Sequence, residues 1–227
     1  MTALGYTFIP VLAVLIGAIA TALRRPGPRL TSAIQHLAAG VVFAAAATEI
    51  LPDVMHAGSP VATLVGGTLG MVVMLGLKSA EERWHGPLAM IGAMGTDLLI
   101  DGLVLGLAFS AGAKAGLLLT VALTLEVLFL GVTVSEELGQ TIKSKARVVM
   151  LTVALALLMP LGTLLAIPVA GLPPLWTTGF LSFGLIALLY LVTEELLVEA
   201  HAKPDSPLIS AMFFVGFLAL LTLEEVM

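Results

Sequence analysis

The sequence contains no cysteine and very few charged residues. The absence of cysteine excludes disulfides, thiolate metal sites and cysteine nucleophiles. Charged residues make up only 11% of the chain, while 59% of the residues belong to the apolar set. Soluble globular proteins contain about 25% charged and about 45–50% apolar residues. Together with a mean hydropathy of +1.11, this composition predicts an integral membrane protein whose main partner is lipid.

Positive charge is also scarce, with 10 Lys and Arg against 15 Asp and Glu and a net charge of −5. Nucleic-acid binding requires a basic surface, so a nucleic-acid partner is not expected. The chain contains no phosphate-binding loop of the form G-x-x-x-x-G-K-[ST]. If this protein moves a solute, we therefore expect gradients to drive the movement.

Apolar stretches bounded by charges or turn residues predict an all-α protein with eight transmembrane helices, forming one domain over residues 1–227. The predicted spans are 3–22, 31–55, 60–80, 87–111, 115–140, 147–170, 175–200 and 207–226. Because each span needs about 20 apolar residues, the chain leaves no room for a soluble domain. The first stretch has no basic residues before it, so we expect it to remain as a span.

The basic residues of the connections predict the orientation of the spans. Nine Lys and Arg fall in the odd-numbered connections, whereas the even-numbered connections contain only Lys114. Cytoplasmic loops of membrane proteins carry an excess of Lys and Arg. We therefore predict a multi-pass protein of the inner or plasma membrane with both termini outside the cytoplasm.

A short internal similarity relates the second span to the seventh. Residues 48–56 (TEILPDVMH) resemble residues 193–201 (TEELLVEAH), with Thr, Glu, Leu and His at the same offsets. Spans two and seven run in opposite directions, so the similarity predicts an inverted repeat relating the first three spans to the last three. Inverted repeats are common in secondary transporters.

Three acidic residues lie near the middle of predicted spans, Asp97 and Asp101 in the fourth and Glu126 in the fifth. A carboxylate at this depth costs about 2.5–3.5 kcal/mol on insertion scales, and no Lys, Arg or His lies at a similar depth. The i,i+4 spacing places Asp97 and Asp101 on one helical face, and Glu126 follows after a short turn. Oxygen ligands suit Mg²⁺, Mn²⁺ and Ca²⁺, and zinc also accepts them. The alternative is a protonated pair that hydrogen-bonds neighbouring helices.

Further acidic residues extend this row toward both membrane surfaces. They are Glu49 and Asp53 at the outer end of span two, and Glu136, Glu137, Glu194, Glu195 and Glu199 at the inner ends of spans five and seven. We expect them to mark an acidic route for a cation, with proton release as the cation arrives. For Glu136, Glu137, Glu195 and Glu199 the alternative is an interfacial side chain that reaches water, which is also the expectation for the histidines at span edges, His36, His56, His85 and His201.

The motifs around these acids resemble those of the ZIP (Zrt/Irt-like) metal transporter family. Residues 97–102 (DLLIDG) resemble the fourth-span signature His-Asn-x-Pro-Glu-Gly, and residues 126–131 (EVLFLG) the fifth-span motif. Residues 159–162 (MPLG) resemble the sixth-span Glu-Pro-Leu-Gly, and residues 194–199 (EELLVE) the seventh-span pattern. The resemblance implies eight spans, outward termini, a homodimer and a metal site in spans four and five.

The chain also departs from the family pattern. Coordinating side chains remain at Asp97, Asp101 and Glu126, whereas family ligand positions are occupied by Leu98, Val127, Leu130 and Met159. About one set of ligands is left, and the central histidines that favour zinc are absent. The resemblance therefore implies a divergent member whose substrate is one of Zn, Mn, Fe, Co or Cd.

These observations predict a transporter rather than an enzyme, because the mid-span acids lack a neighbouring His or catalytic Ser motif. The predicted function is movement of divalent metal ions through a mid-membrane carboxylate site by alternating access. The metal ligands would be Asp97, Asp101, Glu126 and the flanking acids Glu49, Asp53, Glu194, Glu195 and Glu199. The alternatives are a membrane cation sensor or regulator without transport, and a proton-linked carrier of another solute.

Overall fold

The computed structural model describes residues 3–24, 26–83, 87–204 and 206–227. These residues form helices and no strands, and eight of the helices are long and apolar enough to cross a membrane. The spans are Ala3–Leu23, Pro28–His56, Pro60–Ala80, Ile91–Ala111, Ala113–Thr141, Lys145–Ala170, Pro174–His201 and Pro207–Val226. The predicted all-α class and the predicted eight spans are confirmed, and the bounds differ by only a few residues.

Four spans are single helices and four are interrupted. The single helices are α1 (Ala3–Leu23), α4 (Pro60–Arg83), α5 (Pro87–Ala111) and α6 (Ala113–Thr141). Span two consists of α2 (Pro28–Ala45), η1 (Ala46–Ile50) and α3 (Leu51–His56), and span six of α7 (Lys145–Ala156) and α8 (Leu158–Ala170). Span seven consists of α9 (Pro174–Tyr190), η2 (Leu191–Leu196) and α10 (Leu197–His201), and span eight of α11 (Pro207–Ser210) and α12 (Met212–Val226).

Proline stands at two of the four interruptions. Pro160 has no backbone N–H to donate within the helix, and span six breaks at Leu157, which joins α7 to α8. In the second span, Pro52 stands in the first turn of α3, directly after the π-helical segment η1. Proline is favoured in a first turn because its missing N–H would have had no helical partner there.

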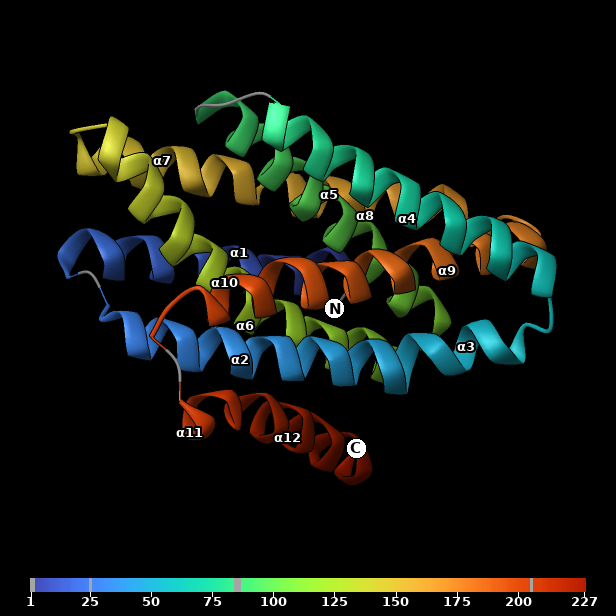
Figure 1. Cartoon of the computed structure of the whole chain (residues 1–227). Helices are drawn as coiled ribbons and strands as arrows, with labels where there is room; N and C mark the ends of the chain where they lie inside the picture. The colour runs from blue at the N-terminus through green and yellow to red at the C-terminus, as the bar shows by residue number, and fades with distance from the viewer. Residues whose placement is uncertain (1–2, 25, 84–86, 205) are drawn as a thin grey trace.

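The helices pair in a way that reveals the predicted repeat. The most extensive contacts join α1 to α6, α5 to α8, α4 to α9, and α2 to α12. Suppose that span one is exchanged with span six, two with seven, three with eight and four with five. The α1–α6 pair then becomes the α5–α8 pair, and the α4–α9 pair becomes the α2–α12 pair. Successive spans run in opposite directions (Figure 1), so the relation between the two groups of three spans is an inverted repeat.

Two glycines at equivalent positions allow these pairs to approach closely. A Cβ atom at Gly17 of α1 would overlap the carbonyl oxygen of Leu128 in α6. A Cβ atom at Gly162 of α8 would likewise overlap the carbonyl oxygen of Leu99 in α5. The spacing between the two glycines equals the spacing between Thr48 and Thr193. The repeat is therefore visible in these close backbone contacts as well as in the short sequence similarity.

The similar motifs of spans two and seven take the same unusual conformation. Thr48 and Glu49 lie in the π-helical segment η1, and Thr193 and Glu194 lie in the π-helical segment η2. Both segments continue into a short α-helix that ends at a histidine, His56 or His201. Single π-helical turns inside α-helices are frequent at functional sites, so these two segments direct attention to the acids that they carry.

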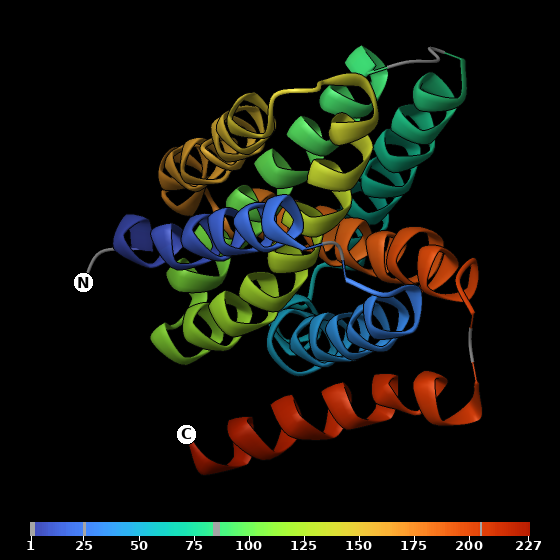
Figure 2. The same cartoon turned by 90° about the vertical axis from the view of Figure 1, so that its left-hand side faces the viewer.

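The fourth and fifth spans occupy the middle of the bundle. They have the largest share of buried residues of the eight spans, whereas the eighth span has the smallest. Figure 2 shows α12 at the edge of the molecule, beside α2. Asp97, Asp101 and Glu126 are consequently surrounded by protein rather than by lipid.

We expect Gly162→Ala to destabilise the protein, because its methyl group would force α8 away from Leu99 and α5. Overpacking of this kind costs about 1–3 kcal/mol, which corresponds to a melting temperature lower by roughly 2–10 °C in detergent. Gly76→Ala is the matched control, because nothing lies within 4 Å of a Cβ atom at Gly76. Equal melting temperatures for the two variants would contradict the close approach.

Candidate metal centre

Three carboxylates converge in the middle of the bundle. Asp97 and Asp101 of α5 and Glu126 of α6 each offer an oxygen atom, and these atoms lie within 4.8 Å of one another. The side chains are buried, with exposed fractions of 9%, 1% and 3%. The predicted convergence of spans four and five on one site is confirmed, and among the described residues this is the group of acidic and histidine side chains that has metal-binding geometry.

The local sequence of α5 fixes the two aspartates in place. Asp97 and Asp101 are one helical turn apart, so both project from the same face of the helix. The next residue, Gly102, packs its backbone against Met159 of α8. The hydroxyl of Thr163 donates a hydrogen bond of 2.8 Å to the Gly102 carbonyl oxygen. These contacts hold α5 against α8 beside the turn that carries the aspartates.

The cluster has no positive side chain to balance it in the described part of the chain. The ion pairs recorded there join Lys78 to Glu194 and Lys114 to Glu224, away from the cluster. Buried polar atoms in proteins nearly always have a hydrogen-bond partner. Oxygen Oδ2 of Asp101 and oxygen Oε2 of Glu126 are buried without one.

These two oxygen atoms bear on the alternative interpretation of the aspartates as a structural pair. Such a pair would hydrogen-bond neighbouring helices, yet within the described residues Asp101 Oδ2 and Glu126 Oε2 make no such bond. Leaving a buried acceptor without a partner costs about 1–3 kcal/mol, and more for a charged group. A cation bound at these oxygen atoms would supply such a partner.

A cavity connects the cluster with one end of the bundle. Asp97 and Glu126 line it together with Glu195 of η2 and Glu199 of α10. Its volume is about 40 Å³, whereas one water molecule needs about 10–15 Å³ by the same measure. The cavity therefore has room for a partly hydrated ion. The structure brings Glu195 and Glu199 to the same cavity as the central acids, as the predicted acidic route requires.

The opposite half of the bundle differs in chemistry. Glu195 lies close enough to all three central carboxylates to interact with them electrostatically. In the aligned motifs, Ile50 corresponds to Glu195, and Val54 corresponds to Glu199. Both Ile50 and Val54 are buried in the hydrophobic core. The cavity thus approaches the carboxylates from one end, while apolar side chains fill the equivalent position at the other end.

The remaining predicted ligands lie apart from the cluster. Glu194 is exposed and forms an ion pair of 3.3 Å with Lys78. Glu49 accepts a hydrogen bond of 3.3 Å from Thr48 and lies within electrostatic range of Asp53. None of these side chains lines the cavity at Asp97. Their role as metal ligands stays a prediction.

Gln35 was not predicted as a site residue, and the predicted interfacial position of His36 is wrong. Gln35 of α2 lines the cavity and is only 1% exposed, and its neighbour His36 is buried rather than interfacial. The His36 ring lies edge-on to the His201 ring, with 4.8 Å between centroids. The sequence signal for this site was the presence of an amide and an imidazole side chain, Gln35 and His36, inside an apolar span. His85 lies outside the described residues.

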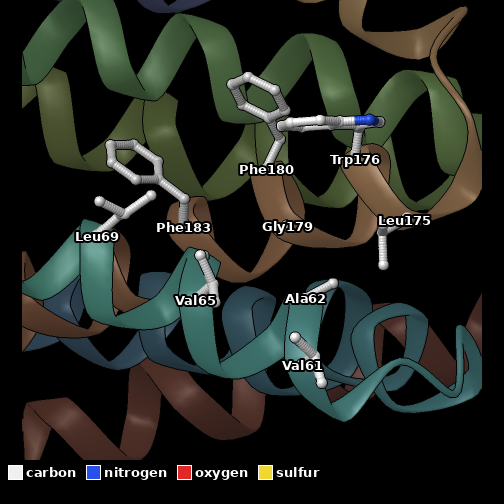
Figure 3. A pocket seen from close by; sticks show the side chains of 10 residues that line it. Val61, Ala62, Val65, Leu69, Leu175, Trp176, Gly179, Phe180 and Phe183 are labelled. Carbon is white, nitrogen blue, oxygen red and sulfur yellow. The ribbon is translucent and has the colours of Figure 1, made fainter.

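A larger groove elsewhere on the bundle has no ion-binding chemistry. It lies between α4 and α9 and has a volume of about 320 Å³. Figure 3 shows its walls, with Val65 and Leu69 on one side and Phe180 and Phe183 on the other. No carboxylate or imidazole lines it, so it does not compete with the central cluster as a site for cations.

Comparison of the chain with models of known protein families and with curated protein sequences finds no match. The functional conclusion therefore depends on the geometry of the carboxylates and of the cavity beside them.

Replacing Asp101 with Asn should raise the stability of the metal-free protein at mildly alkaline pH. The substitution preserves the shape of the side chain and removes a buried charge that has an unpartnered oxygen. We expect a gain of about 1–3 kcal/mol in unfolding free energy, seen as a higher melting temperature in the presence of chelator. Glu225→Gln at the exposed end of α12 should change little. Destabilisation by Asp101→Asn would instead indicate a structural hydrogen bond.

Proposed function

We propose that this eight-span membrane protein transports divalent metal ions, which bind at Asp97, Asp101 and Glu126. The observation that carries the proposal is the set of three buried carboxylates within 4.8 Å, two of them with unpartnered oxygen atoms. A functional use is the physical reason to retain such residues, because ionisable groups inside membranes are expensive and mark ion pathways.

The donor set defines the class of ion. The cluster contains carboxylate oxygens and neither sulfur nor imidazole. Hard oxygen ligands favour Mg²⁺, Ca²⁺ and Mn²⁺ over soft metals, although zinc also accepts carboxylates. A divalent ion balances two of the three negative charges, and a proton retained on the third carboxylate completes the balance. Among the candidates Zn, Mn, Fe, Co and Cd, the hard ion Mn²⁺ fits this donor set best.

The fold offers a route for alternating access. In secondary transporters, the two halves of an inverted repeat can exchange roles, so that a fixed central site opens first to one side and then to the other. In the present conformation a cavity joins Asp97 and Glu126 to Glu199, while Ile50 and Val54 are buried at the opposite end. The ion would leave or enter along Glu195 and Glu199 in this conformation.

The wider proposal is a divergent ZIP-like carrier in the inner or plasma membrane. The resemblance of residues 97–102 and 126–131 to the family motifs supports it, because these motifs supply the three clustered carboxylates. The excess of Lys and Arg in odd-numbered connections supports outward termini, which would place the cavity with Glu199 on the cytoplasmic side. A homodimer is what the resemblance implies.

Metal binding should stabilise the folded protein. A ligand at one hundred times its Kd adds about 2.7 kcal/mol to the unfolding free energy, so a thermal-shift panel over Mn²⁺, Zn²⁺, Fe²⁺, Co²⁺, Cd²⁺ and Mg²⁺ reveals the preferred ion. We expect a metal-selective rise in melting temperature that is lost in the double variant Asp97→Asn and Asp101→Asn. The same rise in the double variant and in the wild type would place the ion elsewhere.

Transport should depend on the same residues. In proteoliposomes with a trapped metal-sensing dye, we expect uptake of the ion selected by the thermal-shift panel. The double variant should reduce uptake to the level of protein-free vesicles, because it removes two of the three ligands. Glu225→Gln, at the exposed end of α12, is the matched control and should transport normally.

The flux measurement also separates the alternatives. Metal-selective binding without metal flux would favour a cation sensor or regulator. Flux of protons without metal would favour a proton-linked carrier of another solute, which would use the same buried acids as a relay. Either result would reject metal transport for this chain.

A further inference from the structure

A chain of polar side chains crosses the end of the cavity where Glu199 lies. The ammonium group of Lys203, two residues beyond α10, donates a hydrogen bond of 3.0 Å to Oε1 of Gln35. The side-chain amide of Gln35 donates in turn to Oε2 of Glu199, at 2.6 Å. The first of these bonds has a charged donor and the second a charged acceptor, and such charge-assisted bonds are the stronger kind. The chain links α2, α10 and the connection to the eighth span.

This chain stands between the central carboxylates and water. Gln35 and Glu199 line the same cavity as Asp97 and Glu126. Gln35 is buried, whereas Glu199 is exposed, so the cavity reaches the surface at Glu199. An ion that leaves the cluster at this end passes the Gln35–Glu199 hydrogen bond. The end of the cavity is therefore lined by the side chains of Gln35 and Glu199, which can rotate.

The flanking contacts keep these side chains together. The hydroxyl of Ser32 donates a hydrogen bond of 2.9 Å to the carbonyl oxygen of Ala200. One turn farther along the bundle, the rings of His36 and His201 are in edge-to-face contact. These contacts fix the beginning of α2 against the end of α10, so Gln35 and Glu199 meet in a defined register.

Lys203 brings a positive charge to a path that is otherwise acidic. Glu195 and Glu199 lie along the path, and Glu195 interacts electrostatically with the central carboxylates. The ammonium group of Lys203 is attached to a flexible four-carbon chain, so it can leave Gln35 when another cation takes its place. A divalent ion at Glu199 would both attract the carboxylate and repel the ammonium group.

We propose that Lys203, Gln35 and Glu199 form a latch that closes this mouth of the cavity and opens when a divalent cation replaces the lysine. The inference concerns regulation of the central site and rests on the proposed function. Closure itself does not require transport, because it is a property of three side chains. The latch and the metal site can therefore be tested separately.

The test uses a single thiol as a reporter of access. The chain contains no cysteine, so Thr133→Cys introduces the only thiol, at a half-buried position that lines the cavity. A charged, membrane-impermeant thiol reagent is added to either side of reconstituted vesicles. Adding Lys203→Gln should raise the labelling rate from one side by about tenfold, because loss of one charge-assisted bond shifts the latch toward its open state.

Two further lysine variants make the result specific. Lys203→Arg keeps the charge and should retain slow labelling. Lys145→Gln removes a lysine that bonds the Ala22 carbonyl oxygen, outside the cavity, and should leave the rate unchanged. Equal labelling rates with Lys203 and with Lys203→Gln would overturn the latch. Failure of the central metal site would appear instead as a missing metal-dependent thermal shift, which Lys203→Gln should preserve.

Discussion

The structure is organised around three carboxyl groups that are buried inside a membrane bundle without a positive side chain beside them. Three carboxylates at about 2.5–3.5 kcal/mol each cost an amount comparable with the whole stability of a typical folded domain, about 5–15 kcal/mol. The surrounding helices must offset this cost by packing. Spans four and five carry the acids and are the most enclosed, and the remaining spans shield them from lipid. This enclosed cluster is the basis of the proposed cation site.

Much of this arrangement follows from local patterns in the sequence. Apolar runs of about 20 residues predict spans because the bilayer sets their length, and the observed spans agree to within a few residues. The i,i+4 spacing of Asp97 and Asp101 fixes their common face through helix geometry alone. Glu126 joined them because its span follows after a turn of one residue, Gly112. These features depend on residues that are close in the chain.

The features that sequence reasoning missed depend on residues that are far apart in the chain. Gln35 and Lys203 are separated by 168 positions, and nothing local to either residue shows that they meet. His36 was expected at the membrane interface because it lies early in its span, yet packing against His201 buries it. Likewise, the acidic patterns of spans two and seven did not indicate that Glu194 would bind Lys78 while Glu195 lines the cavity. Glu194 and Glu195 are neighbours in the π-helical segment η2, and their side chains point in different directions.

The inverted repeat is symmetrical in its backbone and asymmetrical in its side chains. Where one half presents Glu195 and Glu199 to the cavity, the other half buries Ile50 and Val54. Two conformations related by a perfect repeat would have equal energies, and the chain would rest equally in either. Unequal side chains remove that degeneracy, so the proposed transport cycle would have a preferred resting conformation. Under the proposed transport cycle, the same backbone would be tuned toward uptake or release by exchanging a few residues outside the carboxylate cluster.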